Sequence, residues 1–171
     1  VEHKGMLNHL YAKVVDLKLT ENDRIAQNAP QSFDISVWQF WAASLVGGAV
    51  QIFDDEVARD PVQLLDQVAQ RAISILEVVP SLLRIMLEEI ARRPQAPDFS
   101  HLRWLIPTGE ALPPTLGRQW LGHYPYIPVL NAYGPTECSD DVTHYPMFVP
   151  PPLHTINMPI GRPIANMRIY I

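Results

Sequence analysis

The chain has 171 residues, a formal net charge of −5 and an apolar fraction of 47%, which is enough for the core of one globular domain or a large piece of one. The negative balance argues against nucleic acid and against a membrane surface as partners, and the longest nearly apolar stretch, residues 40–50, is too short to span a bilayer. A single cysteine, Cys138, excludes an internal disulfide and, with no secretory signal at the start, favours a reducing, cytoplasmic compartment.

Strand-like and helix-like stretches alternate along the chain. Apolar side chains at helical spacing, or Ser, Asp or Pro at a suitable start, predict helices over residues 5–15, 37–46, 60–71, 80–92 and 113–122. Short apolar runs predict strands over residues 24–27, 49–53, 73–79, 102–106, 126–130 and, last, 167–171. Such alternation implies right-handed crossovers. The fold class expected is therefore α/β, a mostly parallel sheet flanked by helices, with a short mixed β segment at the C-terminal end.

Two parts are expected from composition. Residues 1–145 would form the α/β subdomain, and the proline-rich residues 146–171 would connect it to a following subdomain and supply that subdomain's first strand. Both ends of the chain are abrupt, which suggests a fragment of a larger protein. The six histidines share no metal-ligand spacing and are expected on the surface or in packing contacts. We expect Cys138 to be a small packing residue.

The segment Asn-Ala-Tyr-Gly-Pro-Thr-Glu at residues 131–137 follows a predicted strand. Ligands of open α/β sheets bind where strands end. Asn131 offers a donor and an acceptor for a base edge, and the Tyr133 ring can stack on a base. Thr136 can donate to a phosphate oxygen, and Glu137 can hold Mg²⁺ bridged to phosphates. The alternative is a strand followed by a Gly-Pro turn and a solvated acid.

Four segments in register carry a family resemblance. They are Phe-Asp-Ile-Ser-Val-Trp (33–38), Thr-Gly-Glu-Ala-Leu (108–112), the segment 131–137, and Pro-Ile-Gly-Arg-Pro-Ile (159–164). In this order and spacing they resemble the adenylation domain of nonribosomal peptide synthetases, within the larger family of acyl- and aminoacyl-adenylate-forming enzymes. The resemblance covers essentially the whole chain and implies a flavodoxin-like subdomain. It also implies that ATP and an amino acid form an aminoacyl-adenylate and pyrophosphate. The acyl group then passes to the phosphopantetheine thiol of a peptidyl carrier domain, and condensation domains are further expected partners.

The resemblance assigns roles to individual residues. The cofactor-binding set would be Gly109, Glu110, Ala111, Asn131, Tyr133, Gly134 and Thr136. Within it, Asn131 would contact the adenine amino group, Tyr133 would stack on the ring, and Thr136 would bind the α-phosphate. Glu137 would ligate Mg²⁺, and Thr136 and Glu137 form the expected catalytic pair.

The resemblance also points to an amino-acid pocket. Its residues would be Asp34, Ile35, Trp38, Glu77, Ile106, Thr108, Ala132, Asp140 and Asp141. Asp34 would pair with the substrate α-ammonium, although it could instead only cap a helix. The remaining acids predict a cationic side chain, since an uncharged one would leave them unpaired. The best candidate is 2,4-diaminobutyrate, with ornithine, lysine and arginine also possible.

Several alternatives stay open. Glu77 could face water at a strand end and Asp140–Asp141 could form a solvated loop, and neighbouring strand residues point to opposite faces unless a bulge intervenes. The enzyme could be an acyl- or aryl-acid ligase of the same superfamily, although Asp34 argues against it. The chain could also be an inactive, excised substrate-binding subdomain. The resemblance puts the phosphate-gripping loop before residue 1 and the ribose-binding aspartate and a catalytic lysine after residue 171, so we expect the isolated chain to be inactive.

Overall fold

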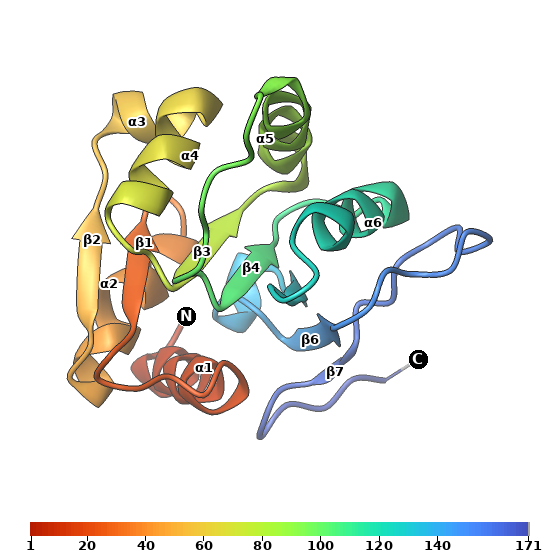
Figure 1. Cartoon of the computed structure of the whole chain (residues 1–171). Helices are drawn as coiled ribbons and strands as arrows, with labels where there is room; N and C mark the ends of the chain where they lie inside the picture. Colours follow the sequence, from red (N-terminus) through yellow and green to blue (C-terminus); the bar gives the residue numbers. More distant parts are fainter. Residues whose placement is uncertain (171) are drawn as a thin grey trace.

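The computed structural model describes residues 1–170 (Figure 1). The strands are β1 (Arg24–Gln27), β2 (Ala49–Ile52), β3 (Ile75–Val78), β4 (Trp104–Pro107), β5 (Val129–Tyr133), β6 (Thr143–Met147) and β7 (Arg162–Pro163). The helices are α1 (His3–Asp16), α2 (Ile35–Val46), α3 (Asp55–Arg59), α4 (Pro61–Gln70), α5 (Pro80–Arg92) and α6 (Pro114–His123), with a 3₁₀ turn, η1 (Thr136–Cys138). No helix within residues 1–170 is long and apolar enough to cross a bilayer.

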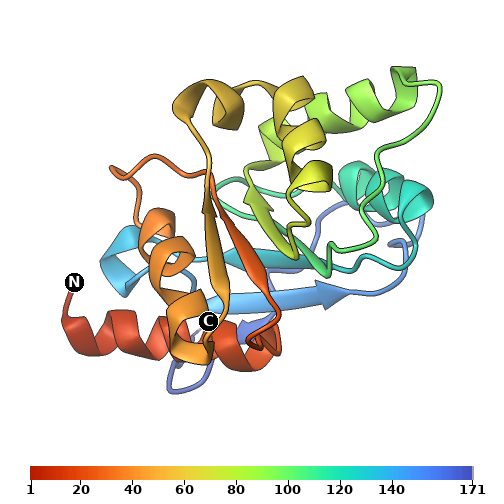
Figure 2. The same ribbon diagram turned by 60° about the vertical axis from the view of Figure 1, so that its left-hand side comes forward.

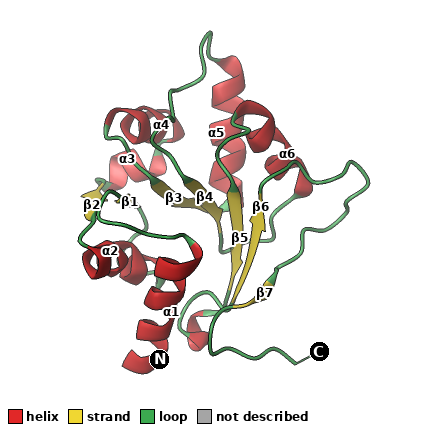
Figure 3. Ribbon diagram, turned by 60° about the horizontal axis from the view of Figure 1, so that its bottom comes forward, coloured by secondary structure: helices red, strands yellow, loops and turns green. Residues whose placement is uncertain are grey.

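All strands join one sheet in the order β2-β1-β3-β4-β5-β6-β7. The strands β1 to β5 pair in parallel, whereas β6 runs antiparallel to β5, and β7 antiparallel to β6. Figure 3 shows the antiparallel strands at one edge of the sheet. The prediction of an α/β fold with a mostly parallel sheet and a mixed C-terminal segment is confirmed.

Helices cover both faces of the sheet (Figures 1 and 2). Apolar residues of α1 and α2 form one core with Ile75 of β3 and Ile106 of β4. Those of α4, α5 and α6 form a second core with Leu76 of β3 and Leu105 of β4. Because side chains alternate along a strand, Glu77 has the same orientation as Ile75. Its carboxylate therefore points toward α1 and α2.

The helix starts follow from local chemistry. Asp60 accepts hydrogen bonds from the backbone N–H groups of Val62 and Gln63, which satisfies donors that the first turn of α4 leaves free. Prolines open α4, α5 and α6, where their fixed φ suits the first helical position. At the other end, α2 stops at Gly47, whose φ of 77° is left-handed and therefore favours glycine.

One expectation about the C-terminal part is wrong. Residues 167–170 form no strand, because no strand within residues 1–170 pairs with them; Ile171, the end of that expected strand, lies outside the described residues. Instead, β6 and β7 are the C-terminal strands, and β6 spans the expected boundary at residue 145. The polar, proline-containing sequence of β6 gave no strand signal. Its register is set by pairing with β5, from Val129 with Met147 to Tyr133 with Thr143.

Candidate active site

The segments after β4 and β5 enclose a cavity of about 300 Å³. Six of the seven residues in the expected cofactor-binding set line it, and only Thr136 does not. They are Gly109, Glu110, Ala111, Asn131, Tyr133 and Gly134. The opposite wall comes from the proline-rich loop, through Asn157, Met158 and Ile160. The structure thus brings together residues from two strand ends and a distant loop, at the sheet edge where open α/β folds bind ligands.

Contacts within this cavity leave the groups needed for a base available. Asn131 is 5% exposed and donates its Nδ2–H to the carbonyl oxygen of Pro159 at 2.8 Å. This bond orients the amide and ties the loop to β5. The ring of Tyr133 is half exposed. The Glu110 carboxylate accepts from the backbone N–H and the hydroxyl of Ser81 at the start of α5, so this side chain already has hydrogen-bond partners within the chain.

Thr136 and Glu137 lie in η1, directly after this cavity, and both are exposed. Thr136 lines a small cavity of about 70 Å³ that also includes Asp34, Trp38 and Asp140. Glu137 lines an open groove of about 880 Å³ along α1, together with Asp141. The neighbouring Cys138 is exposed. Our expectation of a packing cysteine is therefore wrong, because the 3₁₀ turn projects from the sheet edge.

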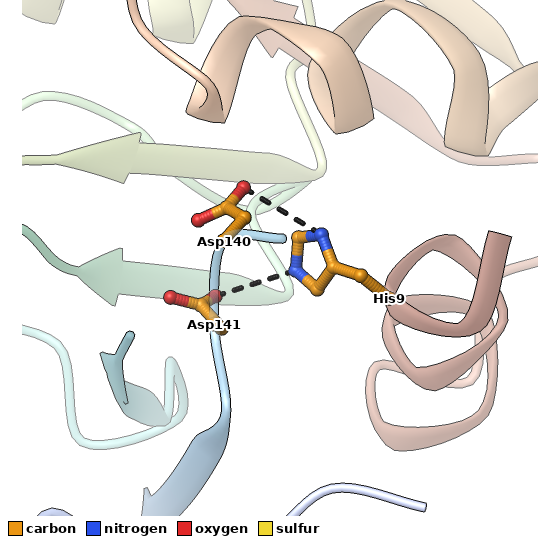
Figure 4. Close-up of side chains that lie close together, drawn as sticks. All are labelled: His9, Asp140 and Asp141. Carbon is orange, nitrogen blue, oxygen red and sulfur yellow. Dashed lines mark ion pairs between the residues drawn. The ribbon is translucent and has the colours of Figure 1, made fainter. Parts of the chain in front are cut away.

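The two aspartates after η1 both reach α1 (Figure 4). Asp140 Oδ2 lies 3.5 Å from Nδ1 of His9, and Asp141 Oδ2 lies 3.6 Å from Nε2 of the same ring. Ser139 and Asp140 have φ values of 70° and 77°, so the chain is not extended here and the alternation of a strand does not apply. Both aspartates are buried, which corrects the alternative of a solvated loop.

Glu77 is also buried, with 3% exposure, and does not face water at a strand end. Trp38 donates its indole Nε1–H to Glu77 Oε2 at 2.6 Å, and Gln39 Nε2 donates to the same oxygen at 3.4 Å. Burial raises the pKa of Glu77 to about 7, although the positive charge of Lys13 opposes this shift. Burial and the neighbouring charge of Asp141 raise the pKa of Asp140 to about 9.

Lys13 of α1 is a member of this cluster that the sequence did not predict. Its side chain is fully buried, and Nζ lies 2.5 Å from Asp141 Oδ2, 3.5 Å from Glu77 Oε1 and 4.5 Å from the centre of the Trp38 ring. Burial disfavours the ammonium, but the charges of Asp141 and Glu77 outweigh it and raise the pKa of Lys13. Burial would likewise raise the pKa of Asp141, but the positive charge of Lys13 and the nearby rings of His144 and His9, each 3.6 Å from Oδ2, hold it well below its usual range.

Two histidines complete the cluster and fit the expectation of packing contacts. His9 is 3% exposed, and His144 Nδ1 lies 2.7 Å from Asp16 Oδ2. Burial lowers the pKa of His9, more strongly than Asp141 raises it. Within the described residues, Nε2 of both rings and Oδ2 of Asp140 lack a hydrogen-bond partner. Buried polar atoms without partners are costly, so this is a site where a ligand or water has a place to bind.

The comparisons with known proteins agree with this geometry. The family described as AMP-binding enzyme matches residues 1–171. The chain is 32% identical to enterobactin synthase component F of Escherichia coli O157:H7 and 30% identical to tyrocidine synthase 3 of Brevibacillus parabrevis, in both cases over all of this chain and over 13% and 2% of the relative. The nonribosomal peptide synthetase FmoA3 has a TM-score of 0.86 at 25% identity, over 97% of this chain and 18% of that one.

The chain belongs to the AMP-binding enzyme family. Its relatives and structural neighbours are nonribosomal peptide synthetases and adenylation domains, which confirms the resemblance. A further neighbour, the adenylation domain AlmE of Vibrio cholerae, was solved with glycyl-adenosine-5'-phosphate and has a TM-score of 0.81 at 25% identity, over 95% of this chain and 30% of that one. This AMP-binding enzyme chain thus spans only a small part of the synthetases that it matches.

The expected amino-acid pocket of this AMP-binding enzyme is divided in the structure. Asp34, Trp38 and Asp140 line the cavity of about 70 Å³. Ile35, Glu77 and Thr108 line another of about 260 Å³ on the far side of the Trp38–Glu77 hydrogen bond. Ala132 lines the cavity of about 300 Å³, and Asp141 lines the groove of about 880 Å³. Ile106 lies in the core beside α1 and α2.

Asp34 combines the two roles considered for it. Its Oδ1 accepts a hydrogen bond from the backbone N–H of Ile35 at 3.0 Å and so caps α2. The carboxylate also lines the same cavity as Thr136 and Asp140. A helix N-terminus favours a negative charge. The cap therefore holds this carboxylate in place without excluding a ligand.

Proposed function

We propose that this chain supplies the adenine site and the amino-acid site of an enzyme that activates an amino acid with ATP, giving aminoacyl-AMP and pyrophosphate. The observation that supports this proposal most directly is that residues of one segment, 131–136, line two cavities. One is lined by Asn131 and Tyr133, and the other by Thr136 and Asp34. A nucleotide lying across Thr136 would bring its α-phosphate toward the cavity that contains Asp34.

Each residue has a defined task in this proposal. Asn131 reads the adenine edge with its free Oδ1, and Tyr133 stacks on the ring. Thr136 donates to the α-phosphate. Glu137, an exposed carboxylate beside the groove, would hold Mg²⁺, which offsets negative charge on the phosphates during attack by the substrate carboxylate. The acyl group would then pass to phosphopantetheine on a peptidyl carrier domain, with condensation domains as further partners in a cytoplasmic synthetase.

Asp34 favours an amino acid over a simple carboxylic acid as substrate. Its carboxylate shares a cavity with Thr136, so a substrate ammonium there would lie close to the reacting phosphate. The similar domain AlmE was solved with an aminoacyl-adenylate, which supports the same choice. The competing proposals are an acyl- or aryl-acid ligase, which has no use for Asp34, and an inactive substrate-binding subdomain, which would bind the amino acid without turnover.

We further propose a basic amino acid, with 2,4-diaminobutyrate as the first candidate and ornithine, lysine and arginine next. Asp140 supports this proposal, because it lines the cavity that also contains Asp34 and its buried Oδ2, 3.5 Å from His9 Nδ1, has no hydrogen-bond partner within the described residues. A substrate with a second ammonium on a short side chain would pair with both carboxylates. The indole of Trp38 limits the volume beside them.

Amino-acid-dependent ATP–pyrophosphate exchange by the intact protein tests this function. The panel would contain 2,4-diaminobutyrate, ornithine, lysine, arginine, serine and leucine, with benzoate and acetate as simple acids. Exchange dominated by a basic amino acid supports both proposals. Exchange with serine or leucine supports the proposed activity but refutes the proposal of a basic substrate. Exchange with a simple acid alone moves the protein to the acyl-ligase branch, and binding without exchange leaves a substrate-binding subdomain.

A further inference from the structure

The buried acids of the candidate pocket already contain a cation from the chain itself. Lys13 lies between Glu77 and Asp141, with Nζ at 3.5 Å and 2.5 Å from their oxygens, and Trp38 faces its ammonium. These three partners are all residues that the family resemblance assigns to the substrate pocket, whereas Lys13 comes from α1. Its position at the end of the stripe formed by Met6, His9 and Leu10 directs it inward from that helix.

The charges divide the pocket acids into two groups. Glu77 and Asp141 share the ammonium of Lys13, which offsets part of the cost of burying them. Within the described residues Asp140 makes no ion pair with a lysine or arginine, although the charge of Lys13 reaches it from farther away; its nearest basic group is His9 at 3.5 Å, whose pKa burial lowers. The carboxylate of Asp140 is therefore the one left for a substrate side chain, and it is also the one that lies in the cavity with Asp34.

A metal ion is a poorer occupant of this cluster. His9, Asp140 and Asp141 offer ligand atoms within 4.8 Å of one another. However, the Asp141 oxygen on that side, Oδ2, already lies 2.5 Å from the ammonium of Lys13, and a divalent cation there would be repelled by it. The geometry therefore assigns the role of fixed cation to Lys13.

We infer that Lys13 is a specificity-determining residue, whose buried ammonium offsets the charge of Glu77 and Asp141 and so limits the pocket to side chains with a single positive charge near Asp140. This inference rests on the proposed amino-acid activation. Without Lys13, the charge of Glu77 and Asp141 would no longer be offset and would attract a substrate cation. Lys13 thus lowers the affinity of the pocket for cationic side chains.

The ratio of kcat/KM for 2,4-diaminobutyrate to kcat/KM for homoserine measures this effect, because the two side chains have similar size and differ in charge. We expect Lys13→Met in the intact protein to raise the ratio at least about tenfold, since a like charge at close range is removed. The matched control is Lys18→Met, which changes an exposed lysine just after the same helix. A ratio that stays within twofold of the wild type, or falls, overturns the inference.

A second background keeps the test valid if Lys13→Met alone unfolds the protein. Glu77→Gln removes one acid and leaves Lys13 paired with Asp141. Adding Lys13→Met to it removes the positive charge as well, so that the double variant lacks one charge of each sign relative to the wild type. We expect that second step to raise the ratio about tenfold; an equal ratio in both variants overturns the inference. Calorimetric titration with the two amino acids gives the ratio of their dissociation constants, which tests the same charge effect on binding alone. Wild-type protein that neither exchanges nor binds amino acids refutes the proposed function, whereas unchanged selectivity without Lys13 refutes only its role.

Discussion

The indole of Trp38 donates to the carboxylate of Glu77 at 2.6 Å, and the two side chains are 1% and 3% exposed. This bond joins the first turns of α2 to the middle of β3. A buried carboxylate needs such donors, because burial without them is costly. It also separates the cavity that contains Asp34 from the one that contains Thr108, so it affects both the stability of the fold and the shape of the site.

Trp38→Phe tests the contribution of this bond to stability. Phenylalanine fills much of the same volume but has no N–H, so one oxygen of Glu77 would depend on Gln39, which is 3.4 Å away. We expect the free energy of unfolding in urea to fall by about 1–3 kcal/mol. Trp41→Phe on the same helix is the control, because Trp41 is 59% exposed, and it should stay within about 0.5 kcal/mol of wild type. Equal effects of the two changes would contradict the prediction.

The pKa of Glu77 predicts a pH dependence. Burial raises it from 4.5 to about 7, so between these values the folded chain binds a proton that the unfolded chain has released. The stability contributed by Glu77 therefore falls as the pH rises from about 4.5 to about 7, and is constant above that. We expect Glu77→Gln to gain stability relative to wild type across this range, by at most about 1.4 kcal/mol per pH unit.

Urea unfolding at pH 5, 6, 7 and 8 measures this difference. Glu88→Gln is a suitable control, because the Glu88 side chain is 54% exposed on α5 and its difference from wild type should not change with pH. Other titrating groups, such as His9 and Asp140, are present in both proteins and largely cancel in the comparison. A difference between Glu77→Gln and wild type that is flat from pH 5 to 8 would count against a raised pKa.

The sequence predicted the central sheet well because each parallel strand is a short apolar run between turn residues. It did not predict β6, whose Thr-His-Tyr-Pro-Met sequence becomes a strand only through pairing with β5. The lining of the cavity of about 300 Å³ was predicted in part, because six of its residues lie in two short motifs. Its third wall, which includes Met158, was not, because that loop is held in place by the long-range bond from Asn131 to Pro159.

The acidic pocket shows the limit of position-by-position inference. Glu77, Asp140 and Asp141 were predicted as pocket residues and all three are buried. Their pairing was missed, because the partner, Lys13, precedes Glu77 by 64 residues and lies on a helix to which no role was assigned. One signal was available. A lysine that continues the apolar stripe of an amphipathic helix must be paired or exposed, and an acid in an apolar strand needs a cation.

Tyr133 provides a test of the adenine site. If its half-exposed ring stacks on the base, Tyr133→Ala should raise the KM for ATP in pyrophosphate exchange roughly tenfold or more, since stacking contributes about 1–3 kcal/mol per base. Tyr133→Phe retains the ring and should leave the KM within about threefold of wild type. Tyr126→Ala, at a residue that is 93% exposed, controls for the loss of a surface tyrosine. A similar KM for ATP in all three variants would show that Tyr133 does not stack on the base.

Gly134 connects the adenine cavity to the buried aspartates. A Cβ on this residue would lie 2.0 Å from the carbonyl oxygen of Asp140 and 2.6 Å from the Cα of Asp141. Both neighbours are backbone, so neither can move away as a side chain would. We expect Gly134→Ala to destabilise the protein by at least about 2 kcal/mol, and also to move Asp140 away from His9 and Asp34. The preference for 2,4-diaminobutyrate over homoserine should then decrease along with the stability.

Gly122→Ala is the matched control, because a Cβ there would meet nothing within 4 Å. That residue lies near the end of α6, where alanine favours the helix over glycine, so we expect the variant to be as stable as wild type or slightly more stable. Thermal unfolding and pyrophosphate exchange on both variants separate the two effects. If Gly134→Ala unfolds earlier but retains the full preference for the amine, then Asp140 does not bind the substrate side chain. If Gly134→Ala is as stable as Gly122→Ala, then the close approach of residues 134 and 140 is wrong.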